Sequence, residues 1–117
     1  VAELSEAEMD EVVAYIETRS ATSGEMTVQG DSVRGAELYA NCAACHGLSA
    51  TGNRALSAPA LVNRDDWYLR RQLKLFQSGY RGQHPEDIAG AQMRSAAQLL
   101  KSDEDINDVL AHIGTLN

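Results

Sequence analysis

The stretch Cys42-Ala43-Ala44-Cys45-His46 contains the densest group of reactive side chains in the sequence. A helix brings residues three positions apart to the same face, so the two thiols would lie together, and the imidazole follows directly. A structural zinc site usually needs four Cys or His ligands in paired clusters, and there is no second Cys-x-x-Cys here. A dithiol redox site would begin a helix at its first cysteine, whereas here a helix is expected to lead into it. A disulfide between the two cysteines would leave the imidazole unexplained.

Cys-x-x-Cys-His is the attachment sequence of c-type haem. Two thiols at this spacing can bond to the two vinyl groups at one edge of a porphyrin, and the next residue then places an imidazole under the iron. We therefore predict one covalently attached haem c, with Cys42 and Cys45 as the attachment points and His46 as an iron ligand.

A haem iron in an electron-transfer protein needs a second axial ligand, which is commonly a methionine. Met93 follows His46 by 47 residues, after a segment long enough to wrap around the ring. The other two methionines, Met9 and Met26, lie in the N-terminal quarter of the chain. The other two histidines, His84 and His112, are rival candidates for the second axial ligand. We favour Met93.

Composition divides the chain into two parts. It has 117 residues and is 44% hydrophobic but only 5% aromatic, which is typical of one globular domain whose centre is filled by something besides aromatic side chains. No apolar run approaches the roughly 20 residues that cross a bilayer, and a net charge of −7 argues against a nucleic acid partner. Residues 1–31 hold eight acids and one base, whereas residues 32–117 hold nine of each.

An internal repeat explains this division. Residues 5–18 align without a gap with residues 102–115, and five of the fourteen positions are identical. Each copy opens with a predicted capping box, formed by Ser5 with Glu8 and by Ser102 with Asp105. Each then carries an apolar stripe at helical spacing. The chain begins at Val1, with no initiator methionine and no signal-like segment, so we expect that a leader or a longer upstream region has been removed. The repeat leads us to expect that residues 4–19 are the final helix of an upstream haem domain.

The remaining elements are also predicted to be helical. The pattern indicates helices over 32–45 and 66–78, a shorter one over about 93–100 and a terminal helix after Ser102. The stretch 47–64 contains two glycines and a proline and is expected to be an irregular loop, and residues 20–31 are interpreted as a linker. No alternating pattern indicates a strand, so the fold class is all-α.

The ordered set of motifs resembles the class I cytochromes c. The matching residues are Gly35-x-x-x-Tyr39, Cys42-x-x-Cys45-His46-Gly47, Pro59-Ala60-Leu61, Met93 and a terminal helix with Val109, Ala111 and Ile113. The stretch from Tyr68 to Gly82 is similar to one branch, the bacterial cytochromes c often found as tandem two-haem proteins. The resemblance covers about residues 32–117 and implies a class I cytochrome c fold wrapped around one haem, with residues 1–31 as an appended acidic helix and linker.

The resemblance also implies roles for single residues. Cys42 and Cys45 would carry the thioethers, and His46 and Met93 would bind the iron. The carbonyl of Pro59 would accept a hydrogen bond from the far nitrogen of His46. Three side chains would reach the propionates or line the pocket, namely Tyr68, Gln72 and Arg81.

The implied function is one-electron transfer, as a soluble carrier or as a module of a tandem or larger respiratory protein, and not enzymatic catalysis. The alternative is a haem peroxidase or sensor in which the methionine leaves the iron. The implied partners are redox proteins such as a terminal oxidase, a reductase or another cytochrome, and the implied location is the periplasm. We expect the N-terminal helix to fold back onto the domain or to pair with another chain as a dimer.

Overall fold

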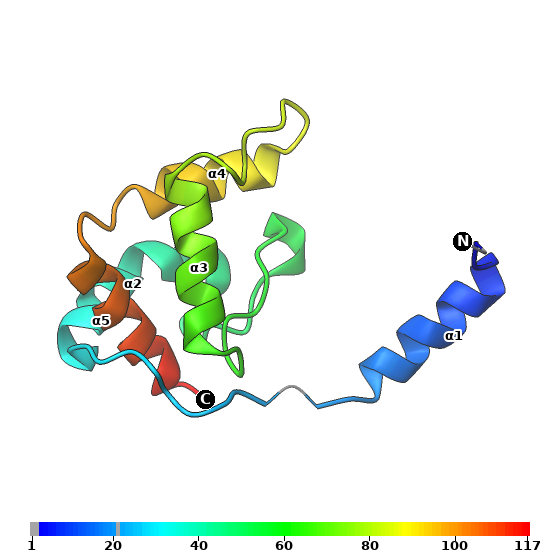
Figure 1. The fold of residues 1–117 in the computed structure, drawn as a ribbon, viewed down its shortest axis with the longest axis horizontal. Helices are drawn as coiled ribbons and strands as arrows, with labels where there is room; N and C mark the ends of the chain where they lie inside the picture. The colour runs from blue at the N-terminus through cyan, green and yellow to red at the C-terminus, as the bar shows by residue number, and fades with distance from the viewer. Residues whose placement is uncertain (1–2, 21) are drawn as a thin grey trace.

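The computed structural model describes residues 3–20 and 22–117 (Figure 1). In chain order its elements are α1 (Glu6–Glu17), α2 (Ser32–His46), the 3-10 turn η1 (Arg54–Leu56), α3 (Asp66–Gln77), α4 (Ile88–Ala97) and α5 (Asp103–Gly114). Within the described residues these helices are joined by loops and no strand forms, apart from one isolated bridge between Asn53 and Ala58. The all-α prediction is confirmed.

The predicted helix starts follow from side-chain caps. The Asp31 carboxylate accepts hydrogen bonds from the first N–H groups of α2, and both halves of the capping box between Ser5 and Glu8 form on α1. The second predicted box forms only by half. The Ser102 hydroxyl accepts from the Asp105 N–H, but the Asp105 carboxylate accepts from the Lys101 N–H instead of the Ser102 N–H.

One predicted helix start was wrong. Helix α4 begins at Ile88, five residues before the expected start near 93, because the Asp87 carboxylate accepts from the Gly90 N–H and caps the helix there. The loop over 47–64 is also not wholly irregular. The side chain of Asn53 caps the short turn η1.

The core forms where α2 crosses α5. Seven side chains make up its buried cluster, namely Tyr39, Ala50, Leu100, Ile106, Val109, Leu110 and Ile113. The crossing is close because Gly35 has no side chain: a Cβ at that position would lie 1.8 Å from the carbonyl oxygen of Asp108. The crossing is completed by the Tyr39 ring, which packs on the His112 ring with centroids 5.1 Å apart.

The predicted linker is held against the domain over much of its length. The carboxylate of Asp66, at the start of α3, accepts hydrogen bonds from the N–H and hydroxyl of Thr27 and from the N–H of Val28, at 2.6–2.7 Å. Asp65 accepts from the Gly24 N–H at 2.6 Å. This segment therefore belongs structurally to the domain that follows it.

Helix α1 projects away from the other helices (Figure 1). None of its residues is buried, and it does not fold back onto the domain. The radius of gyration is 15.7 Å, compared with the roughly 13 Å expected for a compact chain of this length. Among the described helices, none has the length and apolar character needed to span a membrane.

Candidate haem site

The site is built on the last turn of α2. His46 is the final residue of the helix and is 6% exposed. Its Nδ1 lies 2.8 Å from the carbonyl oxygen of Pro59. Because a carbonyl oxygen can only accept, Nδ1 carries the proton, and in the neutral ring the lone pair is on Nε2. The imidazole is thus held in the tautomer that a metal ligand requires.

The two thiols lie on the same helix and are not joined in a disulfide. Cys42 is half-buried against the core cluster and Cys45 is exposed. Burial raises the pKa of the Cys42 thiol, and the neighbouring Cys45 raises it further. Neither cysteine is consumed in a disulfide, so both are available for attachment, and the raised pKa favours the thiol form of Cys42.

The loop after α2 is anchored to the site from both sides. Tyr39 donates a hydrogen bond from its hydroxyl to the Gly47 carbonyl at 2.6 Å, and the Gly52 N–H donates to the His46 carbonyl at 2.9 Å. Burial, and to a smaller degree Cys42, raises the pKa of Tyr39 to about 12. The phenol therefore stays protonated and donating at all physiological pH values, which fixes the loop that carries Pro59.

Met93 lies in the middle of α4 and is half-buried. Two contacts hold this helix. Gln77 of α3 donates to the carbonyls of Ala97 and Leu100, both at 2.9 Å. Gly82, at φ +77°, lies so close to α4 that a Cβ would be 2.2 Å from the Gly90 carbonyl oxygen. The sequence reasoning missed both roles, and only the left-handed backbone preference of glycine could have indicated the second.

The three side chains expected at the propionates are partly brought together. The Arg81 guanidinium donates to the Gln72 side-chain oxygen at 2.7 Å and lies over the Phe76 ring, 4.4 Å from its centroid. Tyr68 is 43% exposed and packs edge-on against Trp67. Gln72 and Arg81 thus form one polar pair on the α3 side, and Tyr68 stands at the start of the same helix.

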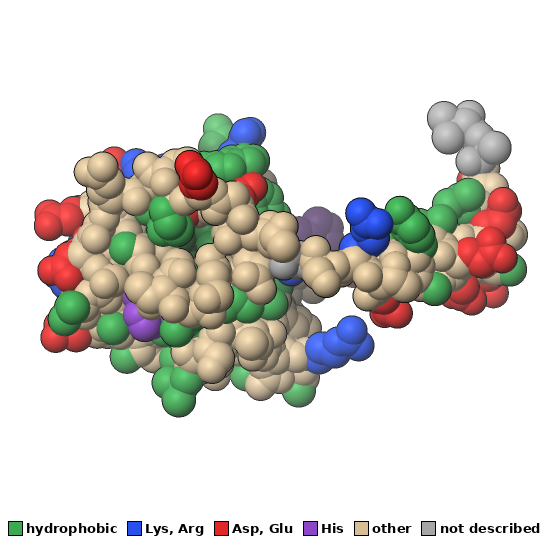
Figure 2. Space-filling model, turned by 90° about the horizontal axis from the view of Figure 1, so that it is seen from below, with side chains coloured by type: hydrophobic (Ala, Val, Ile, Leu, Met, Phe, Trp, Pro, Cys, Tyr) green, Lys and Arg blue, Asp and Glu red, His purple; other side chains and the backbone are tan. Residues whose placement is uncertain are grey.

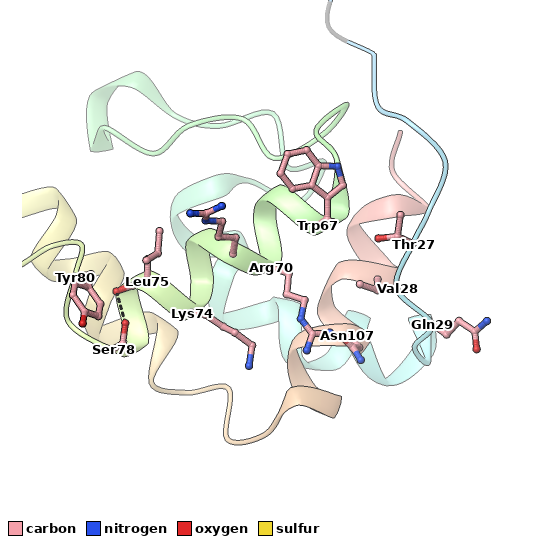
Figure 3. A pocket seen from close by; sticks show the side chains of 11 residues that line it. Thr27, Val28, Gln29, Trp67, Arg70, Lys74, Leu75, Ser78, Tyr80 and Asn107 are labelled. Atoms are coloured by element: carbon pink, nitrogen blue, oxygen red, sulfur yellow. Dashed lines mark hydrogen bonds between the residues drawn. The ribbon is translucent and has the colours of Figure 1, made fainter.

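A cavity of about 750 Å³ lies elsewhere, between the linker and α3 (Figure 3). Thr27, Val28 and Gln29 line it from the linker, and Trp67, Arg70 and Lys74 line it from α3. It includes neither of the cysteines and neither of the expected iron ligands. It is a surface groove separate from the Cys-x-x-Cys-His turn.

The donor set fits a covalently bound haem. It consists of two unpaired thiols one helical turn apart and a buried imidazole whose Nδ1 is already bonded, so that Nε2 is the remaining donor. A half-buried thioether on α4 is a further donor, of the kind that pairs with histidine at haem iron.

An all-α fold with this donor set defines a haem c protein. The family model for cytochrome c matches residues 32–117, and the chain belongs to that family, with the class I fold. A search of curated proteins finds no match. Membership implies covalently bound haem c with iron, haem-based electron transfer and redox proteins as partners.

Proposed function

We propose that this chain carries single electrons on one haem c, attached through Cys42 and Cys45 and ligated by His46 and Met93. The observation that carries the proposal is the bond between His46 Nδ1 and the Pro59 carbonyl, because it orients the ring and leaves Nε2 as the donor. When bound, the haem supplies a one-electron couple, and ligation by His and Met raises its potential and leaves no open iron position.

The protein's own residues hold that couple in place. Tyr39 anchors the loop that carries Pro59, and Gly82 with Gln77 keeps α4, and with it Met93, against α3. Arg81, which bonds Gln72, would supply donors for the propionates together with Gln72 and Tyr68. A rigid setting of this kind minimises reorganisation when the charge of the centre changes.

The partner surface that we propose surrounds the exposed end of the site. Ala44 and Cys45 are exposed there, and so is Pro59, whose carbonyl oxygen contacts His46. Small side chains suit brief, weak encounters, and redox complexes are at the small end of interface sizes. We propose a terminal oxidase, a reductase or another cytochrome as the partner, and the periplasm as the location, where haem is attached to such motifs.

Met93→Ala tests the ligand set. We expect the variant to keep its covalent haem but to lose the ferric Met–iron charge-transfer band. Its potential should fall by on the order of 100 mV, within the roughly 0.8 V span that axial ligands command. Carbon monoxide should bind the reduced variant rapidly at neutral pH and the parent slowly.

Met9→Ala is the matched control, because Met9 is also a helical methionine but lies on the projecting α1. It should leave the band and the potential unchanged. Rapid carbon monoxide binding by the parent would instead favour the peroxidase or sensor function, and an unchanged band in Met93→Ala would refute ligation by this residue.

A further inference from the structure

Helix α1 repeats the buried face of α5 but leaves it in solvent. The four apolar residues of α5 at the repeat positions, Ile106, Val109, Leu110 and Ile113, are 1, 2, 1 and 5% exposed. Their counterparts in α1, Met9, Val12, Val13 and Ile16, are 46, 46, 52 and 59% exposed. Figure 2 shows hydrophobic side chains beside acidic ones on the projecting helix. A stripe of this size normally packs against another element.

The charged positions of α5 that bind bases are also repeated. The Arg34 guanidinium donates to Asp105 and Asp108 at 2.5 and 2.6 Å. Lys74 donates to Asp103 at 2.5 Å, and Arg70 donates to Asn107 at 2.7 Å. At the corresponding positions α1 carries Glu6, Glu8, Asp10 and Glu11. All four are acceptors, so α1 retains the full set of partners for such bases.

The residues of α5 that meet α2 at the close crossing also have counterparts in α1. Gly35 of α2 approaches the backbone of α5 at Asp108, and Tyr39 packs on His112. The corresponding positions of α1 are Glu11 and Tyr15, and Tyr15 is 63% exposed. An aromatic ring thus stands where α5 has the ring that meets α2.

We infer that α1 is the terminal helix of a second cytochrome c domain, which precedes the present one in the same polypeptide. The partner of α1 is a surface like that of α2 and α3 here, with an Arg and a Gly at the positions of Arg34 and Gly35, an aromatic residue at that of Tyr39, and bases at those of Arg70 and Lys74. A terminal helix is the last element of its domain, so that domain lies on the N-terminal side. The inference rests on family membership and holds whichever residue completes the iron coordination.

The resident domain does not offer this surface to α1. Its own α5 fills the crossing with α2, and the bases of the α3 groove are engaged, since Arg70 bonds Asn107 and Lys74 bonds Asp103. A second copy of the chain has the same surface, equally filled. A separate domain that lacks its own terminal helix is therefore the fitting occupant.

A tandem protein made from this sequence tests the inference. A copy of residues 22–101, which includes the segment that bonds Asp65 and Asp66 and the Asp31 cap of α2, is joined in front of Ser5 of the chain, so that α1 follows the copy as α5 follows Lys101. We expect two haems c per polypeptide by mass spectrometry. The α1 amides should exchange with deuterium about 100-fold or more slowly than in the 117-residue chain. A second tandem, with residues 102–115 in place of 5–18, shows whether the copy folds when given a known terminal helix.

Matched variants within the tandem identify the face that docks. Val12→Asp together with Ile16→Asp should abolish the protection of α1 and leave the resident domain folded. Ala7→Asp should have no effect, because the α5 residue at the repeat position, Glu104, is exposed. The inference is overturned if α1 exchanges as fast in the tandem as in the 117-residue chain, or if the Val12 and Ile16 changes do no more than Ala7→Asp.

Measurements on the 117-residue chain alone provide an independent test of the inference. By light scattering we expect a monomer, and by hydrogen exchange an unprotected α1. A dimer that Val12→Asp dissociates would show a second copy as the occupant, and a protected α1 in a monomer would show folding back onto the groove beside α3. Either result overturns the inference.

Discussion

At the residue scale, the site depends on hydrogen bonds that orient groups before any ligand is considered. Pro59 presents a carbonyl to His46 Nδ1, and Tyr39 ties the same loop to the core through the Gly47 carbonyl. Tyr39 is 2% exposed, so on folding its hydroxyl gives up hydrogen bonds to water and bonds the Gly47 carbonyl instead. Such a bond contributes modestly to folding, while its loss frees the loop next to the attachment motif.

Tyr39→Phe measures this contribution. The ring contact with His112 is kept and the hydroxyl bond is lost, so the free energy of unfolding at neutral pH should fall by about 1 kcal/mol. Urea denaturation followed by circular dichroism provides the measurement. Tyr80→Phe is the control, because Tyr80 is 77% exposed, and it should change nothing.

The difference in unfolding free energy between the parent and Tyr39→Phe should depend on pH. The pKa of Tyr39 is raised to about 12 in the folded protein, against about 10 in an unfolded chain. The Tyr39 hydroxyl therefore makes its full contribution to the free energy of unfolding below pH 10, and this contribution is lost as the pH rises towards 12. The advantage of the parent over Tyr39→Phe should shrink in that window, and an advantage that stays constant would contradict the assignment.

At the element scale, the crossing of α2 and α5 is secured by Arg34. Its guanidinium bonds Asp105 and Asp108, and Asp108 also accepts from the Asp31 N–H at 2.7 Å. The pKa of Asp108 is lowered mainly by the hydrogen bond from the Asp31 N–H and next by the bond from Arg34. The pKa of Asp105 is lowered mainly by the bond from Arg34. These four residues join the start of α2 to the first turns of α5.

Asp108→Asn tests this junction. The amide oxygen still accepts from the Asp31 N–H, but the charge opposite Arg34 is gone. A carboxylate whose pKa is lower in the folded protein stabilises the fold at any pH above its unfolded pKa of about 4. This stabilisation is lost as the pH falls through the pKa of the folded state. The urea midpoint of the parent should therefore fall steeply below pH 4, and that of Asp108→Asn should start lower at neutral pH and vary less.

Glu104→Gln is the control for that experiment. It removes an exposed acid from the same helix and should reproduce the acid dependence of the parent. An acid profile of Asp108→Asn that parallels the parent would show that this carboxylate does not contribute to the pH dependence.

At the scale of the whole molecule, the domain begins before α2. The buried Asp66 draws three hydrogen bonds from Thr27 and Val28, and Asn117 donates to the Ser23 hydroxyl at 3.0 Å. Burial by itself would raise the pKa of Asp66, but these bonds outweigh it and lower the pKa. The segment before α2 thus stabilises the ionised carboxylate that the start of α3 buries.

Two truncations separate α1 from this segment. Removal of residues 1–20 should leave the melting temperature unchanged, because α1 has no buried residue. Removal of residues 1–30 should lower it by about 10 °C or more, since bonds to a charged group contribute about 1.5–3 kcal/mol each and 1 kcal/mol corresponds to roughly 4–8 °C in a domain of this size. Both proteins should keep the covalent haem.

Equal melting temperatures of the two truncated proteins would show that the linker contributes nothing. A fall on removal of residues 1–20 alone would show that α1 packs on the domain in solution. Calorimetry of the holoproteins distinguishes these outcomes.

Local patterns were sufficient for most of the elements. The caps at Ser5, Asp31 and Ser102 placed three helix starts, because the side chain and the N–H that it bonds are within three residues of each other. The start of α4 was missed since an Asp87 cap lies in a polar loop with no apolar periodicity before it. The partial box at Ser102 was missed because Asp105 is drawn to Arg34, a residue 71 positions away.

The sequence by itself determined the attachment motif, the helical class and the repeat between the two terminal helices, because each is a pattern of neighbouring residues. Only the tertiary structure decided that Gln72 meets Arg81, that the linker belongs to the domain, and that one copy of the repeat is buried while the other is exposed. Those outcomes depend on which distant segments share space, and burial and charge pairing across the fold are what select them.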